Sequence, residues 1–333
     1  MKKILFISVL FLAVFKMQGQ ILSDSSVRVA GLWNVGDTKN YLITQETYHL
    51  TYGEVVSNRQ FYRYVVRITI VDVTDDYYLI DWYYQDFEIY LDDIFLMYFL
   101  QRVMENLTVT IRTCRLGSFQ EIVNWKEMRD LSLDALNALI EDFATHPYFK
   151  ELLAVMPDFF EPMFAQFETM FSTQEAVLAS YQDIQFFYLF HGFQFNLGEE
   201  IFANTQQPNL FGGYVDAVTT TWLYEICADY DTFFIQSIQT ADSEQLTRLA
   251  LQHLATLTEL GMRPFVESGE LTEYDIKVAV TEVLNTEGTI EQEFWTGAVI
   301  HATTGWPYKV VRMGDTITDG VIIVQEITIE LLQ

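Results

Sequence analysis

The stretch "FYRYVVRITIVDVTDDYYLIDWYYQDF", from Phe61 to Phe87, determines the fold class predicted for this chain. Apolar and polar residues alternate in two runs, which are separated by the turn-forming residues 74–76. The apolar faces of the two runs are Tyr62, Tyr64, Val66, Ile68 and Ile70, and Tyr78, Ile80, Trp82 and Tyr84. A period of two with β-branched and aromatic residues predicts two antiparallel strands, each with one buried face.

The same alternation appears on both sides of these strands. "NYLITQETYHLTYGE" precedes them, and the C-terminal half contains "AVTTTWLYEIC", "TFFIQSIQT", "YDIKVAVTEV", "IEQEFWTGAVIHA", "WPYKVVRM" and "VIIVQEITIELL". Helical spacing predominates from residue 126 to residue 192. The sequence therefore predicts an α+β fold, in which antiparallel sheet from the N- and C-terminal strands packs on a helical middle segment. Whether the two groups of strands form one sheet or two stays open.

The first twenty residues have the pattern of a secretory signal peptide. Lys2 and Lys3 precede a short apolar run, Ile4 to Phe15, and small and polar residues follow it. We expect cleavage and export to the periplasm or the extracellular space, with an uncleaved anchor as the alternative. No later stretch is apolar for long enough to span a membrane as a helix. The predicted divisions are 1–20 signal peptide, 21–125 N-terminal β region, 126–192 helical segment and 193–333 C-terminal α+β region.

The chain is strongly acidic. It has 46 Asp and Glu against 19 Lys and Arg, which gives a formal net charge of -27. Such a surface repels the phosphates of nucleic acids and the headgroups of anionic lipids, so nucleic acid is not an expected partner. The charge favours solubility, and it also attracts cations weakly.

Two cysteines, Cys114 and Cys227, leave two alternatives open. An exported protein meets an oxidising compartment, where the two residues can form a disulfide. Both are predicted to lie on the more polar faces of their strands. The spacing in the sequence does not decide between a disulfide and two free thiols.

Sequence motifs for common catalytic sites are absent. There is no G-x-S-x-G elbow, P-loop or G-x-G-x-x-G. The five histidines form no H-x-H or H-E-x-x-H motif, and there is no C-x-x-C. We therefore expect no cofactor, no metal site and no enzymatic activity.

Aromatic residues are the strongest feature of the composition, with 26 Phe, 19 Tyr and 6 Trp. Between Met156 and Phe195 they combine with methionines at helical spacing. Such side chains can line an adaptable apolar pocket or can simply fill a core. The residues predicted to line a ligand site are Trp82, Tyr84, Met163, Phe167, Met170, Trp222 and Tyr224.

Two segments resemble known exported proteins. "AVIHATTGWPYKVV", residues 298–311, resembles a hairpin of the lipoprotein-carrier (Lol-type) half-barrel, although His301 or Ala302 occupies the position of the usual acid. "GSFQEIVNWKEM", residues 117–128, is similar to a hairpin-to-helix junction of uncharacterised envelope families from Gram-negative bacteria. The resemblance implies a curved antiparallel sheet around helices, with a concave face that holds an apolar ligand. It carries over no catalytic residue.

Together these features favour a non-enzymatic exported protein of the cell envelope. We expect it to bind an apolar or amphiphilic ligand, or a hydrophobic segment of an envelope protein partner. One alternative is a structural or interaction protein of the envelope, whose aromatic residues are all core. A less favoured alternative is a hydrolase, which would need two close acids or a Ser–His pair in a cleft.

Overall fold

The computed structural model describes most of the chain. It covers residues 21–332 apart from 24, 52–53, 92–93, 105–106, 146–172, 175–176, 179–180, 209–213, 268, 270, 286–287 and 319–320. The predicted signal peptide, residues 1–20, lies outside this part. So do Met163, Phe167 and Met170 of the predicted ligand site.

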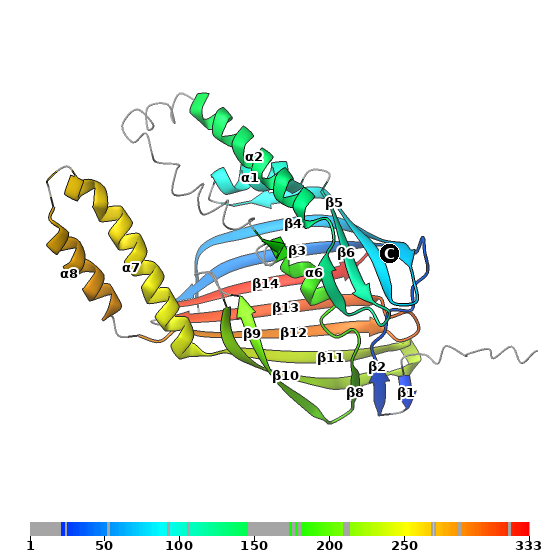
Figure 1. Cartoon of the computed structure of the whole chain (residues 1–333). Helices are drawn as coiled ribbons and strands as arrows, with labels where there is room; N and C mark the ends of the chain where they lie inside the picture. The colour runs from blue at the N-terminus through cyan, green and yellow to red at the C-terminus, as the bar shows by residue number, and fades with distance from the viewer. Residues whose placement is uncertain are drawn as a thin grey trace, which may run out of the picture.

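An antiparallel sheet of 11 strands dominates the molecule (Figure 1). Across the sheet the order is β7-β6-β5-β4-β3-β14-β13-β12-β11-β10-β9. These strands are β3 (Thr38–Thr51), β4 (Glu54–Val73), β5 (Tyr77–Tyr90), β6 (Thr108–Cys114), β7 (Phe119–Ile122), β9 (Glu200–Pro208), β10 (Tyr214–Cys227), β11 (Thr232–Ala241), β12 (Glu291–His301), β13 (Pro307–Thr318) and β14 (Val321–Leu331). Most neighbours in the sheet are also neighbours in sequence, as simple hairpin connections require.

The N-terminal and C-terminal strands form one continuous sheet. They join where β3 pairs with β14, for example at Ile43 opposite Ile329. This pairing answers the question that the sequence left open. A second, 3-stranded sheet consists of β1 (Ile21–Ser23), β2 (Ser26–Arg28) and β8 (Gln194–Asn196).

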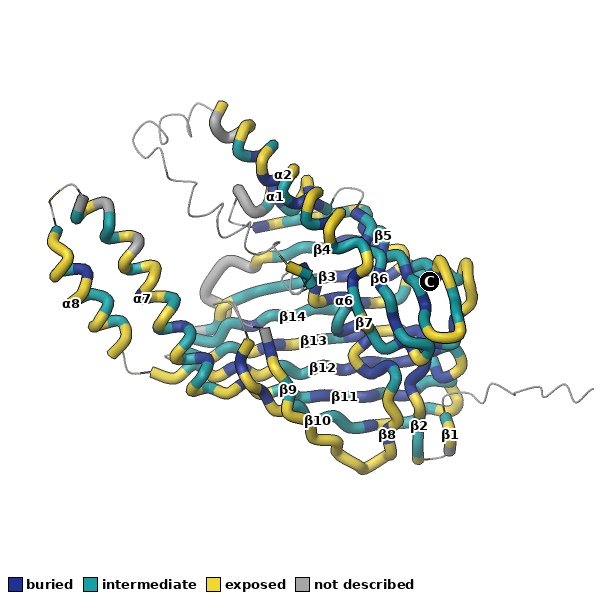
Figure 2. Tube along the Cα trace, viewed as in Figure 1, coloured by how far each residue is buried: buried dark blue, intermediate teal, exposed yellow. Residues whose placement is uncertain are grey.

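The large sheet curves around the short helix α6 (Gln182–Phe187) (Figure 1). Phe187, the last residue of α6, contacts Tyr41 of β3 and Trp82 of β5 with ring centroids 4.9 and 5.2 Å apart. Phe186 lies over Arg312 of β13. One helix thus contacts inward-facing residues from distant strands, and the concave face of the sheet becomes the core. Figure 2 shows buried and more exposed residues alternating along these strands.

The other helices in the described part of the chain lie toward the ends of the sheet. They are α1 (Ile94–Met104), α2 (Trp125–Thr145), a 3-10 turn (Ala228–Tyr230), α7 (Ser243–Glu267) and α8 (Glu273–Leu284). The helices α1 and α2 pack on each other, and so do α7 and α8. Within the described residues, no helix is both long enough and apolar enough to cross a membrane.

One predicted strand, "YDIKVAVTEV", is the helix α8 instead. Thr272 begins this helix with a capping box, in which its side chain accepts from the backbone N–H of Asp275 and the Asp275 side chain accepts from the backbone N–H of Thr272. The sequence T-x-x-D carried this signal. The short alternation of apolar residues led to the wrong prediction of a strand. The helix α8 buries Ile276, and a single buried residue does not distinguish a helical period from a strand period.

The predicted buried faces of β4 and β5 are confirmed. Tyr64, Val66, Ile68 and Ile70 of β4 are buried, and Tyr62 is half-buried. Tyr78, Ile80, Trp82 and Tyr84 of β5 are all buried as well.

The "TTGWP" segment forms the corner between β12 and β13, as the resemblance of residues 298–311 to a hairpin implies. Gly305 has a φ of 75°, a conformation that glycine adopts without strain, and Pro307 opens β13. Trp306 is buried, with its ring centroid 4.8 Å from that of Trp33. His191 donates from Nε2 to the carbonyl oxygen of Gly305 at 2.9 Å, so the corner is fixed to the end of the α6 segment.

Candidate functional site

A cavity of about 140 Å³ lies between the concave face of β3–β5 and the helices α1 and α6. Aromatic and aliphatic side chains make up most of its wall. The lining residues are Gln45, Tyr62, Tyr64, Tyr84, Phe87, Ile89, Phe99, Leu100, Val103, Met104, Tyr181 and Asp183. This composition, with one ionisable carboxyl group among apolar walls, is typical of small-molecule sites.

A β-bulge in β5 places both Tyr84 and Phe87 on the cavity wall. The pairing of β4 with β5 shifts between Val65 opposite Gln85 and Arg63 opposite Glu88. At this point Asp86 has a φ of 56°, in the left-handed region that aspartate tolerates better than most residues. The extra residue reverses the alternation, so even positions face inward before the bulge and odd positions face inward after it. Strict alternation misses Phe87 for this reason, and the only sequence signal is the polar Asp86 at an expected inward position.

Asp183 brings a carboxyl group into the aromatic wall. It lies in the first turn of α6 and is 3% exposed. The hydroxyl groups of Tyr64 and Tyr84 each donate to its Oδ2 at 3.1 Å. Nε2 of Gln45 donates to the Tyr64 hydroxyl, also at 3.1 Å. Four residues from β3, β4, β5 and α6 thus form one connected polar group inside the cavity.

Burial raises the pKa of Asp183 to about 6, because the ionised form loses its contact with water. Hydrogen bonds from Ile184, Tyr84 and Tyr64 oppose this effect. Burial and the Asp183 charge also raise the pKa of Tyr181, Tyr64 and Tyr84, so these hydroxyls remain neutral donors. At neutral pH the carboxyl group is therefore mostly ionised.

The rings around Asp183 contact one another. The ring of Tyr64 stacks on Phe87 with centroids 5.4 Å apart and lies 5.5 Å from Tyr84. The rings of Tyr84 and Tyr181 meet edge to face at 6.2 Å. Such contacts, together with the polar group, fix the shape of the cavity wall.

A second buried charge lies two strands away from the cavity. Gln45 of the cavity and Arg312 of β13 both pair with Ile327 of β14, so they occupy one cross-strand row. The Arg312 guanidinium lies 4.0 and 4.1 Å from the ring centroids of Phe186 and Phe294. It donates to Thr296 Oγ1 at 3.0 Å and to Gln239 Oε1 at 3.3 Å, while its buried Nε has no hydrogen-bond partner. Burial lowers the pKa of Arg312 to about 9.

The structure separates the sequence-predicted site residues. Tyr84 lines the cavity, whereas the neighbouring inward residue Trp82 is packed solidly and donates from Nε1 to the Tyr188 hydroxyl at 3.1 Å. Trp222 and Tyr224 lie on the outer face of β10, since Leu223 between them is the residue that packs in the core. The run of threonines before Trp222 gave no apolar face from which its direction could be predicted.

Asp183, Phe87 and the lining residues of α1 were not predicted. Asp183 had no distinguishing signal in the sequence, because it is one of 46 acidic residues. Only its position on α6, facing β4 and β5, separates it from the others.

Cys114 and Cys227 are both free thiols. They lie on β6 and β10, which are not adjacent in the sheet. Of the two alternatives, the structure has the two free thiols and no disulfide between them. Hydrogen bonding to Glu225, followed by burial, raises the pKa of the Cys227 thiol.

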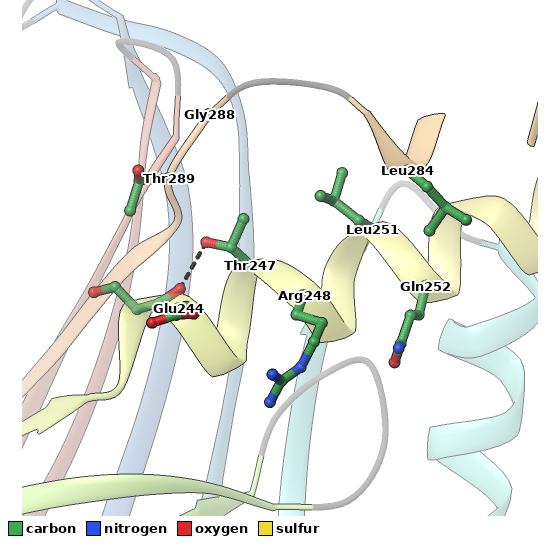
Figure 3. Close-up of a pocket in the computed structure, with 9 residues that line it drawn as sticks. Glu244, Thr247, Arg248, Leu251, Gln252, Leu284, Gly288 and Thr289 are labelled. Atoms are coloured by element: carbon green, nitrogen blue, oxygen red, sulfur yellow. Dashed lines mark hydrogen bonds between the residues drawn. The ribbon is translucent and has the colours of Figure 1, made fainter. Parts of the chain in front are cut away.

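A larger groove of about 500 Å³ lies between α7, α8 and the segment before β12 (Figure 3). Thr247 and Arg248 of α7 and Leu284 of α8 are among its residues, and Thr247 Oγ1 donates to the carbonyl oxygen of Ser243 at 2.7 Å. Every lining residue of this groove is half-buried or exposed. The groove offers little desolvation, so the smaller aromatic cavity is the better candidate site. Within the described residues, no group of three His, Cys, Asp or Glu could hold a metal ion.

No protein-family model and no curated protein matches the chain. Among solved structures, the chain is similar to lipovitellin in a structure that concerns its lipid–protein interactions. The sequence identity is 11%, the TM-score is 0.42, and the match covers 90% of this chain and 25% of the other. The chain thus spans about a quarter of that protein, and the likeness is confined to a partial similarity of shape.

Proposed function

We propose that this protein is a non-enzymatic, exported binding protein that holds a small apolar or amphiphilic ligand inside its curved sheet. The observation that carries the proposal is the cavity of about 140 Å³ on the concave face of β3–β5. Its size suits one ring or a short branched group, because an apolar cavity of about 150 Å³ binds benzene. The walls supply dispersion contacts, and Asp183 with its two tyrosine donors supplies orientation.

The chemistry of the described lining favours binding over hydrolysis. Glycoside hydrolysis uses two carboxyl groups that flank the reacting bond, whereas Asp183 is the one acidic residue among these lining residues. The aromatic wall also continues the face that the sequence predicts on β5. Export to the periplasm or the extracellular space follows from the proposed signal peptide and is part of the same proposal.

Native mass spectrometry tests this function. The exported protein would be purified without detergent, and we expect extra mass that is lost on denaturation. The variant Val103→Phe fills the cavity from α1 and should lower the ligand-bound fraction. Val218→Phe, an equal enlargement at an exposed position of β10, is the matched control. A wild-type protein with bare mass, also after incubation with benzene, would contradict the proposal.

The second candidate function is that of an interaction protein of the cell envelope. The observation in its favour is a set of exposed apolar side chains on β9 and β10, which include Phe202, Tyr214 and Tyr224. The strand β9 is also at the edge of the sheet, where backbone groups are available for pairing. Cross-linking in the intact envelope tests this function, since Phe202→Ser should abolish a specific cross-linked product without changing the cavity.

A further inference from the structure

The carboxyl group of Asp183 lacks a positively charged partner among the described residues. Both donors to its Oδ2 are neutral hydroxyl groups, and no ion pair to Asp183 is present in this part of the chain. Arg312 does not compensate it, because it contacts Phe186, Phe294, Thr296 and Gln239 instead. Buried charges in proteins are usually paired with an opposite charge. When it is ionised, this carboxylate would be stabilised by a positively charged ligand.

The aromatic walls favour the same kind of ligand. Six aromatic residues line the cavity, namely Tyr62, Tyr64, Tyr84, Phe87, Phe99 and Tyr181. The face of an aromatic ring attracts a cation, and the attraction is strongest where water is excluded. A ring-lined cavity with a carboxylate combines two attractions for an organic cation. The net charge of -27 adds a weak long-range attraction for cations.

The hydrogen-bonding capacity of the cavity selects among cations. A primary ammonium group has three N–H donors, and each one needs an acceptor once water is removed. Among the described lining residues the carboxylate of Asp183 is the one anionic acceptor, and its Oδ2 already receives two hydrogen bonds. An alkylated ammonium has fewer donors or none, and its charge is spread over methyl groups that pack well on rings. A trimethylammonium group is also of a size that about 140 Å³ can hold.

We propose that the cavity binds an alkylated ammonium group, with Asp183 as its counter-charge and Tyr64, Tyr84 and Phe87 among the rings that surround it. The proposal rests on the proposed binding function and names the chemical class of its ligand. Any longer part of the ligand would extend beyond the cavity, so free and lipid-linked forms of the headgroup share this chemistry.

Isothermal titration calorimetry with two matched probes tests the proposal on the full exported chain. The probes are choline and its uncharged carbon isostere, 3,3-dimethyl-1-butanol, which share shape and size. We expect choline to bind at least tenfold more tightly than the isostere at pH 7.5. The variant Asp183→Asn should weaken choline binding at least tenfold and leave the isostere unchanged. Asp76→Asn, in an exposed turn of the same sheet, should change neither.

A second variant keeps the test decisive if Asp183→Asn does not fold. Phe87→Leu keeps an apolar wall and removes one ring, so it should weaken choline binding severalfold and spare the isostere. Equal binding of both probes to the wild type would overturn the cation proposal while the binding function stands. Choline binding that is insensitive to both variants would place the site elsewhere and also overturn it. If neither probe binds, the cation proposal fails, and the native mass measurement decides the binding function independently.

If choline binds as proposed, vesicles distinguish the two sources of the headgroup. Retention of the protein on phosphatidylcholine vesicles, with loss in Asp183→Asn, would identify a lipid headgroup. Choline binding without retention would identify a free small molecule.

Discussion

The Tyr84 hydroxyl group donates a 3.1 Å hydrogen bond to Oδ2 of Asp183, 99 residues further along the chain. This contact joins the middle of the N-terminal strands to a short helix on the concave face of the sheet. It also links the fold to the proposed site, because the same carboxyl group is the charged group in the cavity wall. Variants of Tyr84, of Asp183 and of other buried or strained residues test this arrangement.

Replacement of Asp183 should change how stability depends on pH. The pKa of Asp183 is raised from 3.8 to about 6 in the folded protein, so the fold binds this proton more tightly than the unfolded chain does. The resulting stabilisation is fully present below pH 3.8 and is lost as the pH rises through 6. The free energy of unfolding of the wild type, relative to Asp183→Asn, should therefore fall by about 2 kcal/mol between pH 4 and pH 7. Urea unfolding of both proteins tests this, and parallel pH profiles would contradict it.

Removal of the Tyr84 hydroxyl group should destabilise the protein most at neutral pH. Tyr84→Phe keeps the ring and deletes a hydrogen bond to a charged acceptor, so we expect a loss of about 1.5–3 kcal/mol at pH 7.5. The loss should shrink at pH 4.5, where the carboxyl group is protonated. Tyr90→Phe, at an exposed position of the same strand, is the control. An equal loss at both pH values would argue against an ionised Asp183.

The bulge at Asp86 should be sensitive to backbone chemistry. Asp86→Val places a β-branched residue at a φ of 56° and should destabilise the fold by about 1–3 kcal/mol. Asp86→Gly and Asp86→Asn tolerate this conformation and should differ little from the wild type. Urea unfolding of the three variants provides the measurement. If Asp86→Val were as stable as Asp86→Gly, the strained bulge would not be present in solution.

Arg312 should be replaceable by an apolar residue of similar length. Arg312→Met keeps the contacts with Phe186 and Phe294 and removes a desolvated charge, so we expect unchanged or increased stability. Arg312→Ala leaves a cavity between the two rings and should lose about 2–4 kcal/mol. Thermal unfolding at pH 7.5 compares the two. If Arg312→Met lost as much stability as Arg312→Ala, the charge of Arg312 itself would be required.

Both cysteines should react as thiols without reduction. In denaturant, an alkylating reagent should add two labels per chain, which mass spectrometry counts directly. Protein treated first with a reductant is the control and should give the same mass. An unlabelled chain that gains two labels only after reduction would instead establish a disulfide between Cys114 and Cys227.

Part of the candidate site follows from local sequence pattern. The alternation from Tyr78 to Tyr84 predicts which side chains of β5 face the core, and Tyr84, one of these residues, lies on the cavity wall. The pattern fails after Gln85, because one residue in the left-handed conformation reverses the direction of every later side chain. It also fails at Trp222 and Tyr224, where threonines on both faces of β10 leave no apolar side to follow.

Local sequence pattern is enough to predict antiparallel strands and the buried faces of β4 and β5, because side-chain direction in a strand depends on a local period of two. The hairpin corner at Gly305 is local as well, since it depends on the conformational freedom of one residue. Tertiary structure alone decided that β3 pairs with β14, so that N-terminal and C-terminal strands share one sheet. It alone placed Asp183 against Tyr64 and Tyr84. Both depend on contacts between residues far apart in the chain, which are set by how the whole sheet curves around α6 and not by any local pattern.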